Sequence, residues 1–176
     1  MSKLVVGEIE NAAGANPYSI TLSAAQATTS GTSIDFTSIP AGTKRITVMY
    51  VGVSTSGSSD IIAQVGDGGG VETSGYLGCI GSIQASSAAC EAYTDGCGVT
   101  RSHDAANIVH GQTVFELENS SAFTWTMTSC VSWSNSTIVN AASSSKSLSA
   151  ELDRVRITTQ GGSDTFDAGA MSVTFQ

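Results

Sequence analysis

Few residues in this chain could take part in acid–base, nucleophilic or metal chemistry. There are two histidines, His103 and His110, and four cysteines. A serine or cysteine nucleophile needs a base beside it, and no Gly-x-Ser-x-Gly elbow presents a serine. Zinc would find suitable atoms in Cys90, Cys97, His103 and His110, but no Cys-x-x-Cys knuckle prearranges two of its ligands. The sequence therefore predicts no catalytic centre, no cofactor and no metal site.

The acidic residues give no calcium-binding pattern. Most aspartates fall in stretches that predict turns, where such side chains usually bond their own backbone. The phrase GSDTFDAG is rich in oxygen ligands but lacks the alternating Asp-x-Asp-x-Asp spacing of a calcium loop. Asp153, Arg154 and Arg156 are close enough in sequence to form an ion pair on the surface or between subunits.

Composition narrows the partners and the compartment. Charged residues make up 12% of the chain, the net charge is -8, and seven basic residues cannot supply a phosphate-binding surface, so we expect no nucleic-acid partner. No apolar run approaches the roughly 18 residues that span a bilayer, and MSKLVVGEIENAAG lacks the core of a signal peptide. We expect no membrane partner, synthesis in a cytosol and reduced thiols; the alternative is a Cys90–Cys97 disulfide formed in an oxidising exterior.

The elements that must position these residues are β-strands. The stretch 31–65 has the longest β signal, with a turn at Pro40 to Gly42, a strand over 44–53 and another over 60–65 that we expect to pair with it antiparallel. The stretch 122–133 alternates most cleanly and places both tryptophans on one face.

The remaining segments are predicted from the same alternation. We expect a strand over 71–83, one over 108–118, and a final one over 166–175 with Met171, Val173 and Phe175 inward. Residues 135–145 read as a loop. Residues 146–159 read as one long strand whose apolar parity changes, which predicts a β-bulge at Asp153 and Arg154.

Two segments lack a clear period. Residues 84–107 predict a long irregular excursion, with at most one helical turn at 88–92, and long loops commonly carry function. Its candidate receptor contacts are Tyr93, Asp95, Arg101 and His103. The N-terminal stretch is too short to be stable alone. It is either an edge strand of the domain's own sheet or an arm that attaches to another protein through Leu4, Val6, Ile9 and Tyr18.

Nine or ten strands with period-two patterning predict an all-β protein, an antiparallel β-sandwich of jelly-roll type. The predicted organisation is an extended N-terminal arm over residues 1–22 and one sandwich domain over residues 23–176, interrupted by the excursion at 84–107. With 28 Ser and 20 Thr, hydroxyl groups replace charge as the solvated groups of the exposed strand faces.

Three stretches resemble the fibre and appendage proteins of tailed bacteriophages. The opening SKLVVGEIENAAGANPYSITL resembles the N-terminal segment of many phage fibre proteins. The block GTSIDFTSIPAGTKRITVMYVGVSTSGSSDIIAQVGDGGGVETSGY resembles a domain of phage and prophage structural proteins, and ELDRVRITTQGGSDTFDAGAMSVTF is similar to that domain's closing phrase. Residues 84–142 are the least similar part.

The resemblance implies a structural, non-enzymatic virion protein. It would be a short homotrimeric fibre, spike or decoration, made in the bacterial cytoplasm and attached through its N-terminal arm to capsid, portal, adaptor or tail proteins. The alternative is a tail-fibre module that binds a glycan or protein receptor on the host surface. An enzyme acting on envelope polysaccharide would need paired carboxylates in a cleft.

Overall fold

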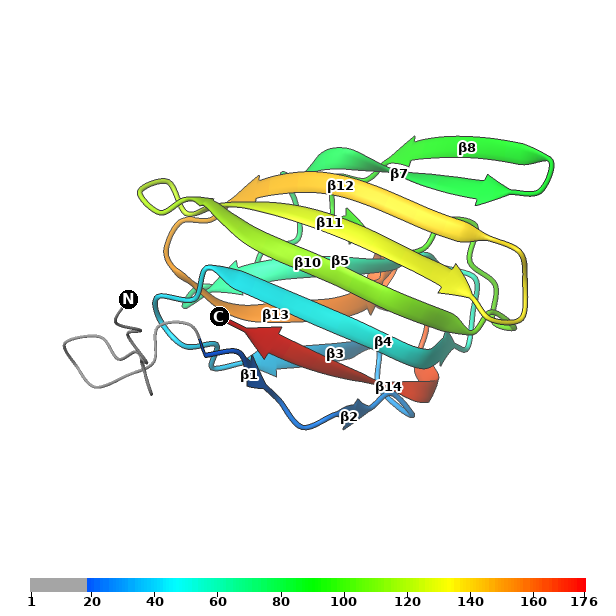
Figure 1. The fold of residues 1–176 in the computed structure, drawn as a ribbon, viewed down its shortest axis with the longest axis horizontal. Helices are drawn as coiled ribbons and strands as arrows, with labels where there is room; N and C mark the ends of the chain where they lie inside the picture. The colour runs from blue at the N-terminus through cyan, green and yellow to red at the C-terminus, as the bar shows by residue number, and fades with distance from the viewer. Residues whose placement is uncertain (1–18) are drawn as a thin grey trace, which may run out of the picture.

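The chain folds as an antiparallel β-sandwich, as the sequence predicts. The structure is a computed structural model that describes residues 19–176, which contain no α-helix and one short 3-10 turn at Gln160–Gly162. Two sheets pack face to face, with β3, β5 and β13 lying behind the larger sheet in Figure 1. The described residues contain no helix long and apolar enough to cross a membrane.

The larger sheet, sheet A, has the strand order β1-β14-β4-β10-β11-β12-β7-β8, with β2 also paired to β14. Every pairing is antiparallel, and β10, β11 and β12 form a meander. Its strands are β1 (Thr21–Leu22), β2 (Gln26–Ala27), β4 (Arg45–Thr55), β7 (Leu77–Gln84), β8 (Ser87–Ala92), β10 (Val109–Asn119), β11 (Thr124–Trp133), β12 (Val139–Ser147) and β14 (Phe166–Phe175).

The smaller sheet, sheet B, has the order β3-β13-β5-β6, with β9 paired to β5. Its strands are β3 (Ser33–Thr37), β5 (Ile61–Asp67), β6 (Gly70–Val71), β9 (Cys97–Gly98) and β13 (Leu152–Thr159). One face of each sheet supplies the core, because alternate side chains of a strand point to the same side. The predicted inward faces of β11 and β14 are confirmed, since Trp125, Trp133, Met171 and Val173 are all buried.

The predicted pairing of the strands 44–53 and 60–65 is wrong. β4 belongs to sheet A and β5 to sheet B, so the chain crosses the sandwich between them. The Asp164 carboxylate accepts a hydrogen bond from the Ser59 main-chain N–H at 2.8 Å, and the Ser54 hydroxyl donates to Asp167. These contacts tie the connection between the sheets to the start of β14 rather than closing a hairpin.

The prediction for residues 135–159 is wrong in its boundaries and right about the bulge. Residues predicted as a loop form most of β12, whose inward positions are the small side chains Asn140, Ala142 and Ser144. The long strand predicted over 146–159 breaks after Ser147, where the chain changes sheets. The register of β13 against β5 shifts between Leu152 and Arg154, which confirms the bulge.

The break before β13 has a visible cause. The Asp67 carboxylate, buried at the end of β5, accepts hydrogen bonds from the Ser149 hydroxyl at 2.7 Å and the Ala150 N–H at 2.9 Å. The same carboxylate accepts a bond from the Gly69 N–H, and these hydrogen bonds hold the pKa of Asp67 below its usual value. One carboxylate therefore fixes both the β5–β6 turn and the passage from β12 to β13.

The predicted irregular excursion at 84–107 is also wrong in part. Residues 87–92, including the predicted helical turn, form β8, and Cys97–Gly98 forms β9. The strand predicted over 71–83 is divided into β6 and β7. Leu4, Val6, Ile9 and Tyr18, the predicted attachment residues, lie outside the described residues. The last residues of the predicted arm, Thr21 and Leu22, form β1 at the edge of sheet A.

Candidate functional site

Two of the four predicted receptor contacts are buried and meet at a residue that was not among the candidates. The Tyr93 hydroxyl donates a hydrogen bond to Asp60 Oδ2 at 2.5 Å, and the His103 main-chain N–H donates to Asp60 Oδ1 at 2.7 Å. Tyr93 and His103 are only 3% and 4% exposed. In this structure neither side chain is presented to an external receptor. Both instead hold the 93–103 segment against the start of β5.

His103 has the neighbours of a nucleophile–base pair but not the access. Its Nε2 lies 3.0 Å from the Thr55 hydroxyl, and its ring packs edge-on against Trp133 at a centroid distance of 6.2 Å. Burial lowers the pKa of His103, although the carboxylates of Asp60, Asp104, Asp164 and Asp167 act in the opposite direction. Because Thr55 and His103 are both buried, no substrate can reach the pair, and the contact is structural.

Tyr93 is likewise held in one protonation state. Burial, and then the hydrogen bond to the Asp60 carboxylate, raise the pKa of Tyr93 far above its ordinary value. A phenolate at this position would face a carboxylate with little water to screen it. The side chain therefore acts as a fixed hydrogen-bond donor and not as an acid or base.

The other two predicted receptor contacts, Arg101 and Asp95, are partly accessible and have different roles. Arg101 Nε is 3.5 Å from Glu91 on β8, and its main-chain N–H donates to Asn140 Oδ1 at 3.1 Å. Asp95 lines a cavity of about 320 Å³, and its carbonyl accepts a hydrogen bond from Gln64 Nε2 at 2.7 Å. Arg101 thus links β8 to the sandwich, while Asp95 borders a space that a ligand could enter.

The cavity beside Asp95 is lined by polar groups from sheet B and the turn after it. Its wall contains Arg156, which forms an ion pair with Asp35 at 2.6 Å, and Thr159, whose buried hydroxyl has no hydrogen-bond partner within residues 19–176. Hydroxyl, amide, carboxylate and guanidinium groups can together bind a polyhydroxylated ligand. The lining residues are Ile62, Gln64, Thr73, Asp95, Arg156, Thr158, Thr159, Gly161 and Gly162.

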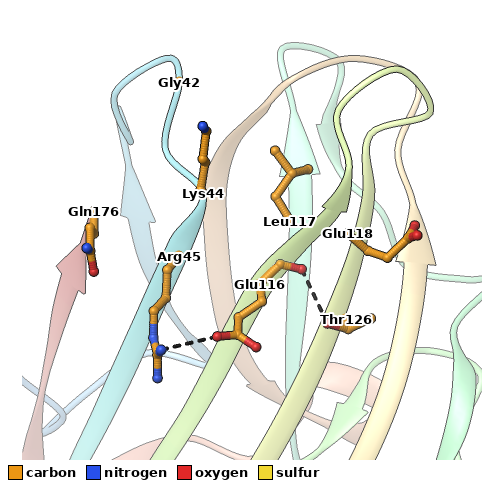
Figure 2. Close-up of a pocket in the computed structure, with 8 residues that line it drawn as sticks. All are labelled: Gly42, Lys44, Arg45, Glu116, Leu117, Glu118, Thr126 and Gln176. Atoms are coloured by element: carbon orange, nitrogen blue, oxygen red, sulfur yellow. Dashed lines mark hydrogen bonds and ion pairs between the residues drawn. The ribbon is translucent and has the colours of Figure 1, made fainter. Parts of the chain in front are cut away.

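A larger hollow of about 830 Å³ lies where β4 begins and β10 ends (Figure 2). Arg45 reaches Glu116 at 3.2 Å, while Lys44 and Glu118 extend away from that pair. The side chains of Arg45 and Glu116 are more than half exposed, so the pair is solvated and contributes little. Glu116 and Glu118 are the two carboxylates here, and both are exposed rather than enclosed in an apolar pocket like a glycosidase general acid.

The cysteines and acidic groups form no metal centre in the described part of the chain. No three His, Cys, Asp or Glu side chains in residues 19–176 lie close enough together to hold an ion. The alternative Cys90–Cys97 disulfide is wrong: both thiols are free, Cys90 is exposed on β8, and Cys97 is buried on β9 in the other sheet.

The class that these observations define is an antiparallel β-sandwich whose buried polar groups hold its loops in place. The chain matches no known protein family, no curated protein and no solved structure.

Proposed function

We propose that this chain is a structural, non-enzymatic component of a bacteriophage virion. It forms a short homotrimeric fibre, spike or decoration that is made in the bacterial cytoplasm and attached to capsid, portal, adaptor or tail proteins through its N-terminal arm. The proposal rests on the three stretches that resemble phage appendage proteins and on the structural roles of the reactive side chains in the fold.

One observation carries the proposal furthest. Two of the resembling stretches, residues 31–76 and 151–175, are far apart in the sequence but pair directly, β4 with β14 and β13 with both β3 and β5. These two stretches supply all of sheet B except β9, and they supply the neighbouring strands β4 and β14 of sheet A. A resemblance spread over two distant segments that fold as one unit supports a common structural domain better than two unrelated short matches would.

The internal chemistry is compatible with a passive particle component. His103, Tyr93 and Asp60 are engaged in fixing loops, and the open hollow at Glu116 is solvated. A surface with many hydroxyl groups and few charges can contact other subunits at a small desolvation cost.

The test is to locate the chain. Phage particles from a lysate of cells carrying the gene are purified by density gradient, and an antibody raised against residues 19–176 is used for immunogold electron microscopy. We expect the chain to co-sediment with the major capsid protein and the label to lie at defined sites on the particle. A chain found only in the particle-free fraction would overturn the proposal.

A second candidate function rests on the cavity beside Asp95. Its convergent polar groups, which include Asp95, Arg156 and Thr158, favour a host-surface glycan as ligand. The test compares adsorption of particles carrying Asp95→Ala, which lines the cavity, with particles carrying Asp104→Ala, which does not. Reduced adsorption for Asp95→Ala alone supports glycan binding, and equal adsorption removes this candidate.

A further inference from the structure

The outer face of sheet A, the face turned away from sheet B, carries side chains in continuous rows. Because all its strands are in antiparallel register, residues on neighbouring strands stand directly opposite one another. One row is Leu22, Thr174, Thr47, Val114, Thr128, Ser143, Cys79 and Ala92. The next two are Ser172, Met49, Gln112, Cys130, Ala141, Gly81 and Cys90, then Ala27, Ala170, Val51, His110, Ser132, Val139, Ile83 and Ala88.

None of these three rows contains an aspartate, glutamate, lysine or arginine. The ion pair Arg45–Glu116 lies one row further along, at the end of the sheet. The outer face of sheet B is different, since Arg156 pairs there with Asp35 and Arg154 with Asp153. A chain with a net charge of -8 therefore leaves one broad face uncharged while the opposite face carries ion pairs.

The same face holds nearly all the large exposed apolar side chains of residues 19–176. Seven such residues are exposed; six lie in or beside these rows, and the seventh, Ile108, directly precedes β10. Leu77 stands opposite Ser145 in the row of the ion pair, and Ile20 lies against Thr47 and Thr174. Single exposed apolar residues are ordinary, but their collection on one face marks an interaction surface.

These apolar residues form two groups on opposite sides of the face. The β1 group is Ile20, Leu22 and Val51, and the β7 group is Leu77, Ile83 and Val139. Strands β10 and β11 lie between them (Figure 1) and present His110, Gln112, Thr128, Cys130 and Ser132. Each group contains one isoleucine, one leucine and one valine, so the two are alike in size and chemistry and can pack on one another in a contact between copies.

The face is large enough for a specific contact. Eight strands spaced about 4.8 Å apart and rows covering about 20 Å of strand length give on the order of 700 Å². A stable protein–protein interface buries about 800 Å² on each partner, and in a ring each copy divides this comparable area between its two neighbours. A second copy of the chain suits this surface, because two copies that each carry a net charge of -8 repel one another least where neither presents a charged side chain.

We propose that the outer face of sheet A packs against further copies of this chain, with the β7 group of one copy on the β1 group of the next. A contact between two different patches is heterologous and closes into a ring if the rotation permits. The inference deepens the proposed function and rests on it for the number of copies, three. What it adds is the surface and the pairing of groups.

The experiment measures mass by sedimentation velocity at micromolar concentration. We expect the wild type at three times 17.9 kDa, and Val51→Asp and Ile83→Asp each at 17.9 kDa. Thr37→Asp, which adds the same charge at an exposed position on the outer face of sheet B, is the control and should keep the wild-type mass. Circular dichroism of each variant checks that the sandwich remains folded.

The pairing is tested with opposite charges in one chain. If the β1 group contacts the β7 group, Val51→Lys alone dissociates the assembly, while the double variant Val51→Lys/Ile83→Asp restores it because every interface then joins a lysine to an aspartate. If each group contacts its own kind, the double variant places like charges together and stays dissociated, which overturns the proposed pairing.

Thiol labelling gives a readout independent of mass. Cys79, Cys90 and Cys130 are exposed on this face, so maleimide labelling of them should be slower in the wild type than in Val51→Asp. A wild type that is an oligomer unaffected by Val51→Asp and Ile83→Asp overturns the inference and leaves the virion assignment standing. A monomeric wild type whose face crosslinks to a different virion protein also overturns it. A dissociable oligomer that is absent from particles supports the inference and refutes the proposed function.

Discussion

The hydroxyl of Tyr93 donates a hydrogen bond of 2.5 Å to the carboxylate of Asp60, the residue that directly precedes β5. Asp60 also accepts the main-chain N–H of His103, and its own carbonyl accepts the N–H of Gln160 at 2.8 Å. Three other parts of the chain therefore bond to this one acidic residue. The carboxylate of Asp60 therefore holds the connection between the two sheets in place.

Removing the Tyr93 hydroxyl should destabilise the domain measurably. Tyr93→Phe leaves the partly buried Asp60 Oδ2 without its charge-assisted donor, so we expect a loss of about 1–3 kcal/mol in the free energy of unfolding, measured by urea denaturation. Tyr50→Phe is the matched control, because Tyr50 makes a neutral bond of 2.9 Å to Thr113. It should lose less, and an equal loss for the two variants would contradict the role given to the Asp60 carboxylate.

His103 should make stability depend on pH between about 5.5 and 7.5. Its pKa in the folded chain is lowered by burial, whereas an unfolded histidine titrates near about 6.5. Above that value the contribution is complete, and below it the unfolded chain takes up a proton that the folded chain does not. Stability should therefore fall with decreasing pH, by at most about 1.4 kcal/mol per pH unit from this group.

Variants at the two histidines separate this effect from other titrations. At pH 7.5 the urea midpoint of His103→Gln should be lower than that of the wild type. Between pH 7.5 and pH 5.5 the midpoint of this variant should change little. His110→Gln, which removes the other histidine and leaves the Thr55–His103 contact in place, is the matched control. If the stability of His103→Gln still falls with decreasing pH as in the wild type, another titrating group causes the pH dependence.

A side chain at Gly169 should destabilise the protein more than a side chain at Gly42 does. Both have positive φ, 91° and 83°, but a Cβ on Gly169 would overlap the Gly52 carbonyl, whereas nothing lies near a Cβ on Gly42. Gly42→Ala should cost about 1 kcal/mol from the backbone conformation alone. Gly169→Ala should cost at least about 2 kcal/mol, because β4 and β14 must move apart. Thermal unfolding of the two variants makes the comparison, and equal losses would show that the strands yield easily.

Strands that bury a large apolar row were predictable from the sequence, and strands built from small residues were not. Phe115, Trp125 and Met127 define the inward faces of β10 and β11 by alternation alone. In β8 all six residues are exposed, and in β12 the buried positions hold Asn, Ala and Ser, so neither strand leaves an apolar period. Main-chain pairing with β7 and β11 forms them, and that depends on the sheet already present.

The network at Asp60 was beyond local sequence signals for a similar reason. Its side-chain partners lie 33 and 43 residues along the chain, and the sequence identifies Asp60 only as one of several turn aspartates. Tyr93 and His103 attracted attention because of their side-chain chemistry in a segment without a period. That chemistry is used internally, since the segment folds back on β5 through β9.

Cys97 should report global unfolding. It is fully buried, and burial raises the pKa of its thiol to about 11, so it is protonated and inaccessible in the folded chain. In a variant with Cys79→Ser, Cys90→Ser and Cys130→Ser, we expect Ellman's reagent to label nothing in native buffer and one thiol in denaturant. Labelling in native buffer at a rate independent of urea would indicate local opening at β9 instead.

The attachment arm can be tested without disturbing the sandwich. Deleting residues 1–17 retains Thr21 and Leu22, which pair with β14, so the truncated chain should keep its circular dichroism spectrum and unfolding midpoint. If the arm attaches the protein to the virion, particles assembled with the truncated chain should lack it. Replacing Leu4, Val6 and Ile9 together by serine should give the same loss, whereas replacing Glu8 and Glu10 by glutamine should not. Because the proposed contact between copies lies on sheet A, the truncated chain should still sediment at the wild-type number of copies. Incorporation of the truncated chain at the wild-type level would instead place attachment within residues 18–176.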